Sequence, residues 1–592
     1  MVSKRLCKKT NPINYSRKDE IMLKDRLVCT GKRGLSLALA LIVCSALPAY
    51  ALEKIDAGVI MDSVKEHKKI VPPQTNVKIE VTQEQKTAPQ QAAGIKFKVN
   101  GFHITGQTVY SEDKLQDLVK DSIGQELNLD ELQITAARIA QYFNDRGYMV
   151  ANAYIPAQKI KNGIVEITVV PGQYGSIDLR NHSKLSSSAA NRFLSQIKIG
   201  DYVKQDVLDR TLLLISDIGG ISINATLAPG KTTGTSDLIV EINDTNLLTS
   251  EFSMDNYGNR YTGEDRGNIS LNFNNLSGAG DMANLSGNKS SDGMNNFNFS
   301  YLMQAGNRGA RVGVGYSQLH YSLGREFEDL NASGTAKSST IYGEYPLIRS
   351  RNRNLYARIG FEHSKLKDRI DYFNNAFTSK HTNSLIFGLS GDSQDKFHGG
   401  GINTFALTIA TGRLGIDGGR DVYGNSAKTF DKEGLNTAGT YTKGNFSFNR
   451  LQYINDRLNF YLGFSGQLAS KNLDSSEKIY LGGANGVRAY PQGEASGDQG
   501  YLITGELRWN LPTPSYQLAV FVDNGRVTIN KSPIPGAGDN NRTLTGAGVG
   551  LLISPRKDYD IRVDYAWRLG SARATSDTDK SGRLWLKGTR YF

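Results

Sequence analysis

Asp523 is the residue whose surroundings in the sequence most strongly call for a chemical partner. It follows a segment in which Leu518, Val520 and Val522 alternate with other residues. Successive side chains of a strand point to opposite faces, so if these three residues face lipid, Asp523 faces inward. A carboxylate inside a membrane protein is costly unless it is paired. We therefore expect a cation beside Asp523, and the alternative is a carboxylate solvated in a polar lumen.

Motifs for catalysis are absent from the sequence. It has no H-E-x-x-H zinc motif, no phosphate-binding P-loop and no G-x-S-x-G nucleophile elbow, and its seven histidines are scattered singly. The three cysteines, Cys7, Cys29 and Cys44, all lie in the first 51 residues. The rest of the chain can therefore form no disulfide, thiol nucleophile or cysteine-ligated zinc site. We predict a protein that is not an enzyme and that uses no cofactor or metal.

Residues 1–51 have the pattern of a signal peptide. Two basic residues precede the apolar stretch Leu35–Leu47, and Ala49-Tyr50-Ala51 follows as an A-x-A cleavage site. Met22 could start a shorter signal, and the sequence does not decide between the two starts. The full chain has a net charge of +12, but residues 52–592 keep only +5, so we do not expect a nucleic-acid partner.

The next segment predicts one helix on a linker. Val59, Ile60 and Val64 fall on one side of an amphipathic helix expected at Ala57–Ile70. The Pro/Gln/Thr-rich stretch Val71–Ala93 that follows predicts a flexible linker. Such a helix is either the end of a disordered tail or a movable plug.

A mixed α/β pattern occurs twice between Ile95 and about Asn243. Each unit is expected to have the order strand, helix, helix, strand, strand over about 75 residues, and units so small are expected to pack together. The expected helices are 111–122, 129–146, 186–196 and 204–218. The expected strands are 97–104, 150–155, 163–170, the start of the second unit near Gly175, 222–228 and 236–243.

From Thr249 to Phe592 the pattern changes to alternation of apolar and polar residues. In Tyr559–Leu569, for example, aromatic and aliphatic residues alternate with Asp and Arg. The even number of segments, with short turns alternating with long links, is typical of a bacterial outer-membrane β-barrel. Closure of the barrel removes the strand edges that lipid cannot satisfy. We count about sixteen segments, starting near residues 249, 267, 281, 294, 309, 337, 354, 383, 402, 441, 458, 501, 516, 546, 559 and 583.

Three motifs narrow the kind of barrel. The first is the run from Met254 to Gly263 (MDNYGNRYTG), followed later by Asn275-Leu276-Ser277-Gly278. The second is the run from Leu481 to Tyr490 (LGGANGVRAY), followed by Gly497-Asp498-Gln499-Gly500-Tyr501, and the third is Phe521-Val522-Asp523-Asn524-Gly525. With two α/β repeats and an N-terminal helix, this order resembles the TpsB transporters of two-partner secretion, of the haemolysin-activator type. The repeats resemble POTRA domains, and the resemblance covers essentially all of the chain after the signal peptide.

The resemblance implies a membrane all-β fold: an outer-membrane barrel of about sixteen strands, two periplasmic α/β POTRA domains and an N-terminal plug helix. The expected domains are 1–51 for the signal peptide, 52–94 for the plug helix and linker, 95–172 and 173–245 for the POTRA domains, and 246–592 for the barrel with a lumenal loop at 470–500.

The resemblance also implies site residues. The loop with Val487, Arg488 and Tyr490 matches one that folds back into the lumen, where Arg488 pairs with Asp523. The family usually has glycine where this chain has Ala489, so the backbone would be strained there if that position requires a positive φ. The last strand fits an aromatic end that the barrel-assembly machinery recognises, although Arg590 interrupts its alternation.

The implied function is translocation across the outer membrane. The expected partners are outer-membrane lipid, the assembly machinery during biogenesis, and an unfolded TpsA-type exoprotein that the POTRA domains recognise in the periplasm. Haemolysin, adhesin and contact-dependent toxin cargoes remain open. The alternatives are an outer-membrane protein insertase of the same superfamily, which normally has more POTRA units, and a passive porin, which needs no α/β region.

Overall fold

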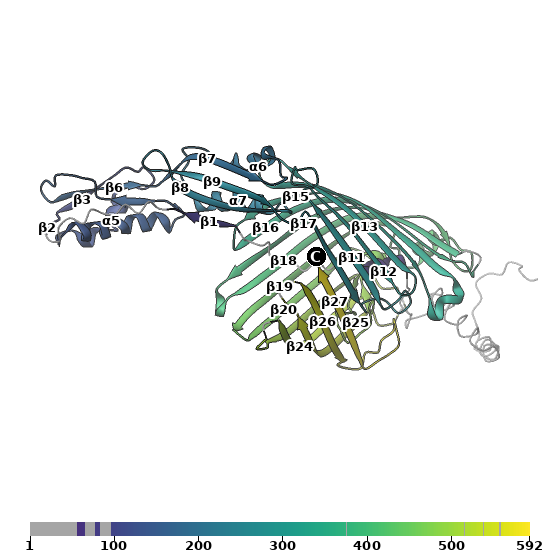
Figure 1. Cartoon of the computed structure of the whole chain (residues 1–592). Coiled ribbons are helices and arrows are strands. Elements are labelled where there is room, and N and C mark those ends of the chain that lie inside the picture. The colour runs from purple at the N-terminus through teal and green to yellow at the C-terminus, as the bar shows by residue number, and fades with distance from the viewer. Residues whose placement is uncertain are drawn as a thin grey trace, which may run out of the picture.

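The computed structural model describes residues 56–64, 77–82, 96–373, 376–513, 515–534, 536, 538–555 and 558–592. The predicted signal peptide and residues 65–70 of the predicted helix lie outside this part of the chain. A closed barrel carries an elongated α/β region at one end (Figure 1). Among the described residues, no helix has the length and apolar character to span a bilayer.

The barrel has sixteen antiparallel strands in chain order, and the last strand pairs with the first. This confirms the fold predicted from the alternating segments. The strands are β10 (Leu248–Asp255), β11 (Arg266–Asn274), β12 (Met282–Ser290), β13 (Met294–Ala305), β14 (Ala310–Ser322), β15 (Ala332–Arg349), β16 (Arg353–Ile370), β17 (Ala376–Asp395), β18 (Gly401–Arg420), β19 (Gly439–Asn455), β20 (Leu458–Ala469), β23 (Gln499–Asn510), β24 (Tyr516–Thr528), β25 (Asn541–Ile553), β26 (Tyr559–Arg568) and β27 (Gly582–Tyr591).

Three strands begin five or more residues before the predicted positions. β15 begins at Ala332 rather than near residue 337, β17 at Ala376 rather than near residue 383, and β25 at Asn541 rather than near residue 546. Apart from Phe377, the outward residues of the added ends are polar, so these ends lack the apolar alternation that marks a lipid-facing strand.

Short elements lie in the connections. They are the helical turns η2 (Arg325–Leu330), η3 (Phe397–Gly399) and η4 (Ser475–Glu477), the helix α8 (Ala427–Glu433), and the strand pair β21 (Ile479–Tyr480) and β22 (Ser496–Gly497). The helix α3 (Ala57–Val64) precedes the α/β region in the chain and packs against β14, β15, β16 and η4.

The first α/β unit has a three-stranded sheet and two main helices. Its elements are β2 (Phe97–Lys98), β3 (Gly101–Thr105), α4 (Glu112–Gln116), η1 (Lys120–Ser122), β4 (Glu126–Leu127), α5 (Leu129–Asn144), β5 (Asn152–Tyr154) and β6 (Ile164–Val170). Asn128 begins α5 with a capping box: its side chain accepts from the Glu131 N–H, and the Glu131 carboxylate accepts from the Asn128 N–H.

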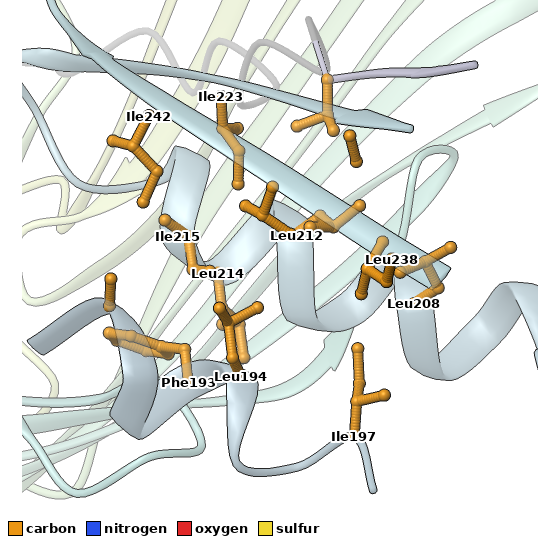
Figure 2. Close-up of a cluster of buried hydrophobic side chains, with 14 of the residues drawn as sticks. Phe193, Leu194, Ile197, Leu208, Leu212, Leu214, Ile215, Ile223, Leu238 and Ile242 are labelled. Carbon is orange, nitrogen blue, oxygen red and sulfur yellow. The ribbon is translucent and has the colours of Figure 1, made fainter. Parts of the chain in front are cut away.

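The second unit repeats the order with β7 (Gln173–His182), α6 (Ser187–Leu194), α7 (Gln205–Ser216), β8 (Ile221–Pro229) and β9 (Thr235–Asp244). Apolar residues of the two helices meet the inner face of the sheet, as Figure 2 shows for Phe193, Leu212 and Ile242. Burial of these side chains stabilises the unit.

The prediction of a flexible linker at Val71–Ala93 is wrong for residues 78–81. Residues 78–81 form a strand, β1 (Lys78–Val81), that pairs in parallel with β8 at the edge of the second sheet, giving the order β1-β8-β9-β7. Val77 is buried in the core of that unit. Within this Pro- and Gln-rich stretch, residues 77–81 (Val-Lys-Ile-Glu-Val) alternate between apolar and charged side chains, a pattern that is typical of an edge strand. The composition of the surrounding residues predicted a linker instead.

The second unit is fastened to the turns at one end of the barrel. Arg349 makes a bidentate ion pair with Asp217 at 2.8 and 2.7 Å, and Arg351 pairs with Asp209 at 2.7 Å. The turn that contains Arg351 joins β15 to β16, so these turns lie on the periplasmic side with the α/β region. The longer links, including 421–438 and 470–498, lie at the opposite end of the barrel.

Candidate functional site in the barrel lumen

The link between β20 and β23, residues 470–498, is the lumenal loop. Its residues Leu481, Val487 and Tyr490 are almost completely buried, and they cluster with Phe521 and Leu544 of the barrel wall. A loop that extended into solvent would leave these apolar residues exposed. The loop therefore lies inside the barrel and packs against the inner faces of β24 and β25.

Arg488 and Asp523 meet directly. Nε and Nη2 of Arg488 donate to the two carboxylate oxygens of Asp523 at 2.9 and 2.8 Å, and the Arg488 N–H donates to the same carboxylate at 3.2 Å. Asp523 is completely buried, while Leu518, Val520 and Val522 are exposed on the outer face of β24. The bidentate geometry fixes both the distance and the orientation of the loop tip.

Two further carboxylates, Glu506 of β23 and Asp564 of β26, reach the same guanidinium. Nη1 of Arg488 lies 3.1 Å from Glu506 and 3.3 Å from Asp564. Arg562 binds both of these acids at 2.8 Å, and Arg508 binds Glu506 at 2.7 Å. The network holds three carboxylates and three guanidiniums, so the buried charges balance.

Sequence reasoning missed these additional partners. In the sequence, Glu506, Arg508, Arg562 and Asp564 alternate with apolar and aromatic residues, which was the available signal. It could not show which of them would lie beside Arg488, because that depends on the register of four strands and on the path of the loop.

The neighbours of Arg488 pack tightly. The Phe521 ring lies 3.2 Å from the Arg488 guanidinium carbon, and the Trp585 indole N–H donates to the Arg488 carbonyl oxygen at 2.6 Å. The Val487 N–H donates to the Leu481 carbonyl at 2.7 Å, and the Tyr490 hydroxyl donates to the Ala572 carbonyl at 3.0 Å.

Ala489 has no left-handed backbone, so the strain considered from the sequence does not arise. Its methyl group packs against Gly546 of β25, where an added Cβ would lie 2.6 Å from it. The positive φ angles of the loop occur instead at Gly483, Gly493 and Ala495. Glycine at position 546 therefore provides the space that Ala489 occupies.

Glu494 holds the loop at a second point. It is completely buried and forms an ion pair with Arg542. Its carboxylate also accepts from the N–H groups of Thr575 and Ser576 at 2.8–3.0 Å and from both of their hydroxyls. Thr575 and Ser576 belong to the link 569–581, so Glu494 ties the lumenal loop to a cell-surface loop. No sequence motif pointed to it.

Helix α3 lies inside the barrel between the wall and the lumenal loop. Ala57 and Ile60 are completely buried beside the inward side chains of β13 to β16, and the partly buried Val64 packs on the same cluster. Val59 is on a different side, next to Gly493 of the loop. The wall residues of the cluster are Met294, Leu319, Tyr321, Ala336 and Leu366.

The start of α3 is anchored by polar contacts. The Asp56 carboxylate accepts from the N–H groups of Gly58 and Val59 at 3.0 and 3.2 Å and from the Ser475 hydroxyl at 2.7 Å. The Ala57 N–H donates to Asp368 of β16 at 2.8 Å. These bonds satisfy the first N–H groups of the helix and connect it to both neighbours.

A family model described as haemolysin secretion/activation protein ShlB/FhaC/HecB matches residues 234–553, which is more than half of the chain. The chain belongs to this family. A model of the ShlB-type POTRA domain matches residues 97–172, the first α/β unit.

Individual relatives agree with the family match. The heme/hemopexin transporter protein HuxB of Haemophilus influenzae strain 86-028NP is 31% identical over 492 residues, which cover 81% of this chain and 84% of HuxB. The outer membrane transporter CdiB of Dickeya dadantii is 20% identical over 87% of this chain and 92% of its own. The solved structure of CdiB from Escherichia coli has a TM-score of 0.64 at 18% identity, covering 98% of this chain and all of CdiB.

The ShlB/FhaC/HecB match makes this chain a TpsB transporter of the outer membrane, which serves two-partner secretion and is not an enzyme. The family implies a secreted substrate of TpsA type. The match to secretion proteins decides against the insertase and the porin considered from the sequence.

Proposed function

We propose that this protein recognises an unfolded TpsA-type exoprotein through its two α/β units and releases it through the barrel. The lumenal loop and α3 both lie in the lumen, so both must shift before a chain can pass. Their fastening by non-covalent contacts to the wall supports this proposal, because such contacts can open and re-form. Arg488 and Asp523 act as the latch of the loop, and α3 acts as the plug.

Strand addition to the second sheet is the recognition route that we favour. An extended segment can bind an exposed sheet edge through main-chain hydrogen bonds with little demand on its sequence. The β8 edge accepts β1, which shows that a strand fits there. β1 has only four residues, and all but one of them are exposed, so a longer exoprotein segment can replace it.

Replacement of β1 would also affect the plug. β1 and α3 belong to the same N-terminal stretch, separated by residues 65–77. An exoprotein segment on the β8 edge would therefore free the chain that leads to α3. Recognition at the α/β region would then be coupled to the opening of the lumen.

The relatives bear on the cargo. HuxB, a heme/hemopexin transporter, is about 30% identical to this chain, whereas CdiB is at about 20%. This difference favours an exoprotein that takes part in haem acquisition over a contact-dependent toxin. Binding of haem or haemopexin by the exoprotein in the culture medium tests that assignment.

A disulfide lock tests the recognition route. Glu80 and Thr226 are register partners on β1 and β8, and residues 45–592 contain no cysteine. The E80C/T226C variant should secrete at least tenfold less of a co-expressed exoprotein, and reductant should restore secretion. A locked variant that secretes as well as the wild type would contradict recognition at this edge.

The matched control locks a pair that we expect to stay together. Asn224 and Glu241 are register partners on β8 and β9 of the same sheet. The N224C/E241C variant should secrete normally in the oxidised state. Each single-cysteine variant should do the same.

A further inference from the structure

The outer surface of the barrel differs between its two ends along strands β15 to β18. These strands have 18–20 residues, against 9 in β11 and 10 in β26, and they extend beyond the rest of the wall at the end opposite the α/β region (Figure 1). Exposed apolar residues form a band on their middle part, including Ile341, Phe361, Leu385 and Ile409. Beyond that band the outward residues become basic.

The facing of these basic residues is fixed by their neighbours in the chain. Leu366 and Ala336 pack against α3 in the lumen, so Lys365, Lys367 and Lys337 point outward. By the same argument Arg413 points outward, because the adjacent Leu414 packs on Tyr441 and Leu473 in the lumen. We call the outward set Lys337, Lys365, Lys367, Arg369, His381 and Arg413 the basic patch.

The register brings like charges together in the basic patch. Lys337 on β15 is directly opposite Lys365 on β16. Like charges directly opposite in a sheet destabilise it. This pair of like charges therefore lowers the stability of the sheet unless an anion binds to it.

The chain itself supplies few anions to the basic patch. His381 is bound to Asp417, and Arg369 is bound to Asp371. In the part of the chain that the structure describes, Lys337, Lys365, Lys367 and Arg413 form no ion pair. Most of the patch charge is thus available to a ligand.

The patch lies at the depth of lipid headgroups. Lys365 is four residues beyond Phe361, a distance of about 13 Å along the strand and roughly 10 Å in height for a strand tilted by about 40°. The headgroup layer lies within several ångströms of the hydrocarbon edge, and a lysine side chain can reach back along the surface. The ammonium groups can therefore reach anionic groups at the membrane surface.

The opposite wall has no comparable cluster among the described residues. The outward residues of β23 and β26 at this level include Tyr501 and Trp567, and Arg526 of β24 is an isolated cation. The charge is therefore a local feature of one side of the barrel. A ring of cations around the whole barrel would have indicated only a solvated rim.

We propose that the basic patch binds the phosphate groups of glycolipids in the outer leaflet. A lipid A headgroup carries two phosphates at opposite ends of a disaccharide, and the basic patch extends over the four strands β15 to β18, which spans roughly 14 Å at about 4.8 Å per strand. This lipid site is independent of exoprotein recognition. It would hold one side of the barrel in a fixed lipid environment.

Binding of bis-phosphorylated lipid A to the full-length protein in detergent, followed by native mass spectrometry, tests the proposal. The K337Q/K365Q/K367Q variant should bind at least tenfold more weakly, because each cation near an anionic surface contributes about fivefold. The matched control K289Q/R526Q/K580Q removes three scattered cations from the same end and should bind like the wild type. Unchanged heat-dependent gel mobility shows that each variant still forms a barrel.

Two measurements on the wild-type protein keep the proposal testable if the triple variant does not assemble. Dephosphorylated lipid A should bind at least tenfold more weakly than the bis-phosphorylated form, and millimolar inorganic phosphate should fail to displace the lipid. Equal binding of the two lipids, or equal loss in the patch and control variants, would overturn the proposal. Displacement by free phosphate would overturn the assignment to a lipid headgroup.

Discussion

The two segments that fill the lumen are held by different kinds of contact. The tip of the lumenal loop is held by Arg488 in a network of three buried carboxylates and three guanidiniums. Helix α3 is held by two completely buried small or aliphatic side chains, Ala57 and Ile60, and by hydrogen bonds at its first turn. The wall contacts of α3 include an apolar cluster, and its polar contacts are those of its first turn.

This difference indicates which segment opens more readily. Withdrawal of Arg488 would leave three buried acids with too few cations, a state that costs several kcal/mol. Withdrawal of α3 exposes a small apolar area and leaves its polar partners, Ser475 and Asp368, accessible to water in the opened lumen. We infer that withdrawal of α3 from the lumen costs less free energy than withdrawal of Arg488 from its ion-pair network.

The largest expected effect comes from breaking the latch. Arg488→Ala leaves Asp523, Glu506 and Asp564 with two guanidiniums, whereas Asp523→Ala leaves Arg488 with two acids still in reach. Loss of one partner of a buried pair costs about 3–5 kcal/mol. Both variants should cut exoprotein secretion, and R488A should be the more severe, as measured by exoprotein in the medium.

Barrel assembly is the control for both latch variants. Heat-dependent mobility on gels should be unchanged, because the sixteen-strand ladder does not depend on the loop. Normal secretion by both single variants would show that the Arg488 network is structural only. A D523A variant that is more severe than R488A would mean that the additional acids do not hold the loop.

Local patterns predicted the barrel, the two α/β units and the inward facing of Asp523, whereas its pairing with Arg488 followed from the family resemblance of the loop motif. Strand alternation is such a pattern. Glu494 and the β1 strand were not predicted. Both depend on contacts between segments far apart in the chain, Glu494 with residues 575–576 and β1 with β8, and no short pattern encodes them.

A smaller effect is expected at the second fastening of the loop. Glu494→Gln keeps the shape of the side chain but removes the charge that Arg542 meets, and its amide NH₂ would face the Thr575 and Ser576 donors. The link 569–581 should then detach while Arg488 keeps the tip in place. Faster cleavage of that link by protease on intact cells, with secretion reduced less than in R488A, is the expected result.

The outcome at Glu494 tests whether the two fastenings of the lumenal loop, at Arg488 and at Glu494, act separately. If E494Q abolished secretion as fully as R488A, the two fastenings would act as one unit and the tip would have no separate role. The conservative variant Asp577→Asn, in the same link but paired with Arg583, is the matched control and should leave the lumenal loop undisturbed.

The smallest expected effect comes from a substitution that weakens the docking of the plug α3 alone. Gly58 of α3 lies so close to the lumenal loop that an added Cβ would be 2.3 Å from the Ser476 nitrogen. Gly58→Ala favours the helix itself by about 1 kcal/mol, so any loss of docking comes from the clash and not from unfolding of α3. The variant should raise ion conductance in planar bilayers while secretion persists, approaching the conductance of a variant that lacks residues 53–70.

Gly101→Ala, where nothing lies within 4 Å of the added methyl group, is the matched glycine control and should conduct like the wild type. Unchanged conductance in both G58A and the deletion would mean that the Arg488 loop seals the lumen without help from α3, and the weaker contacts of the helix would then have no gating role.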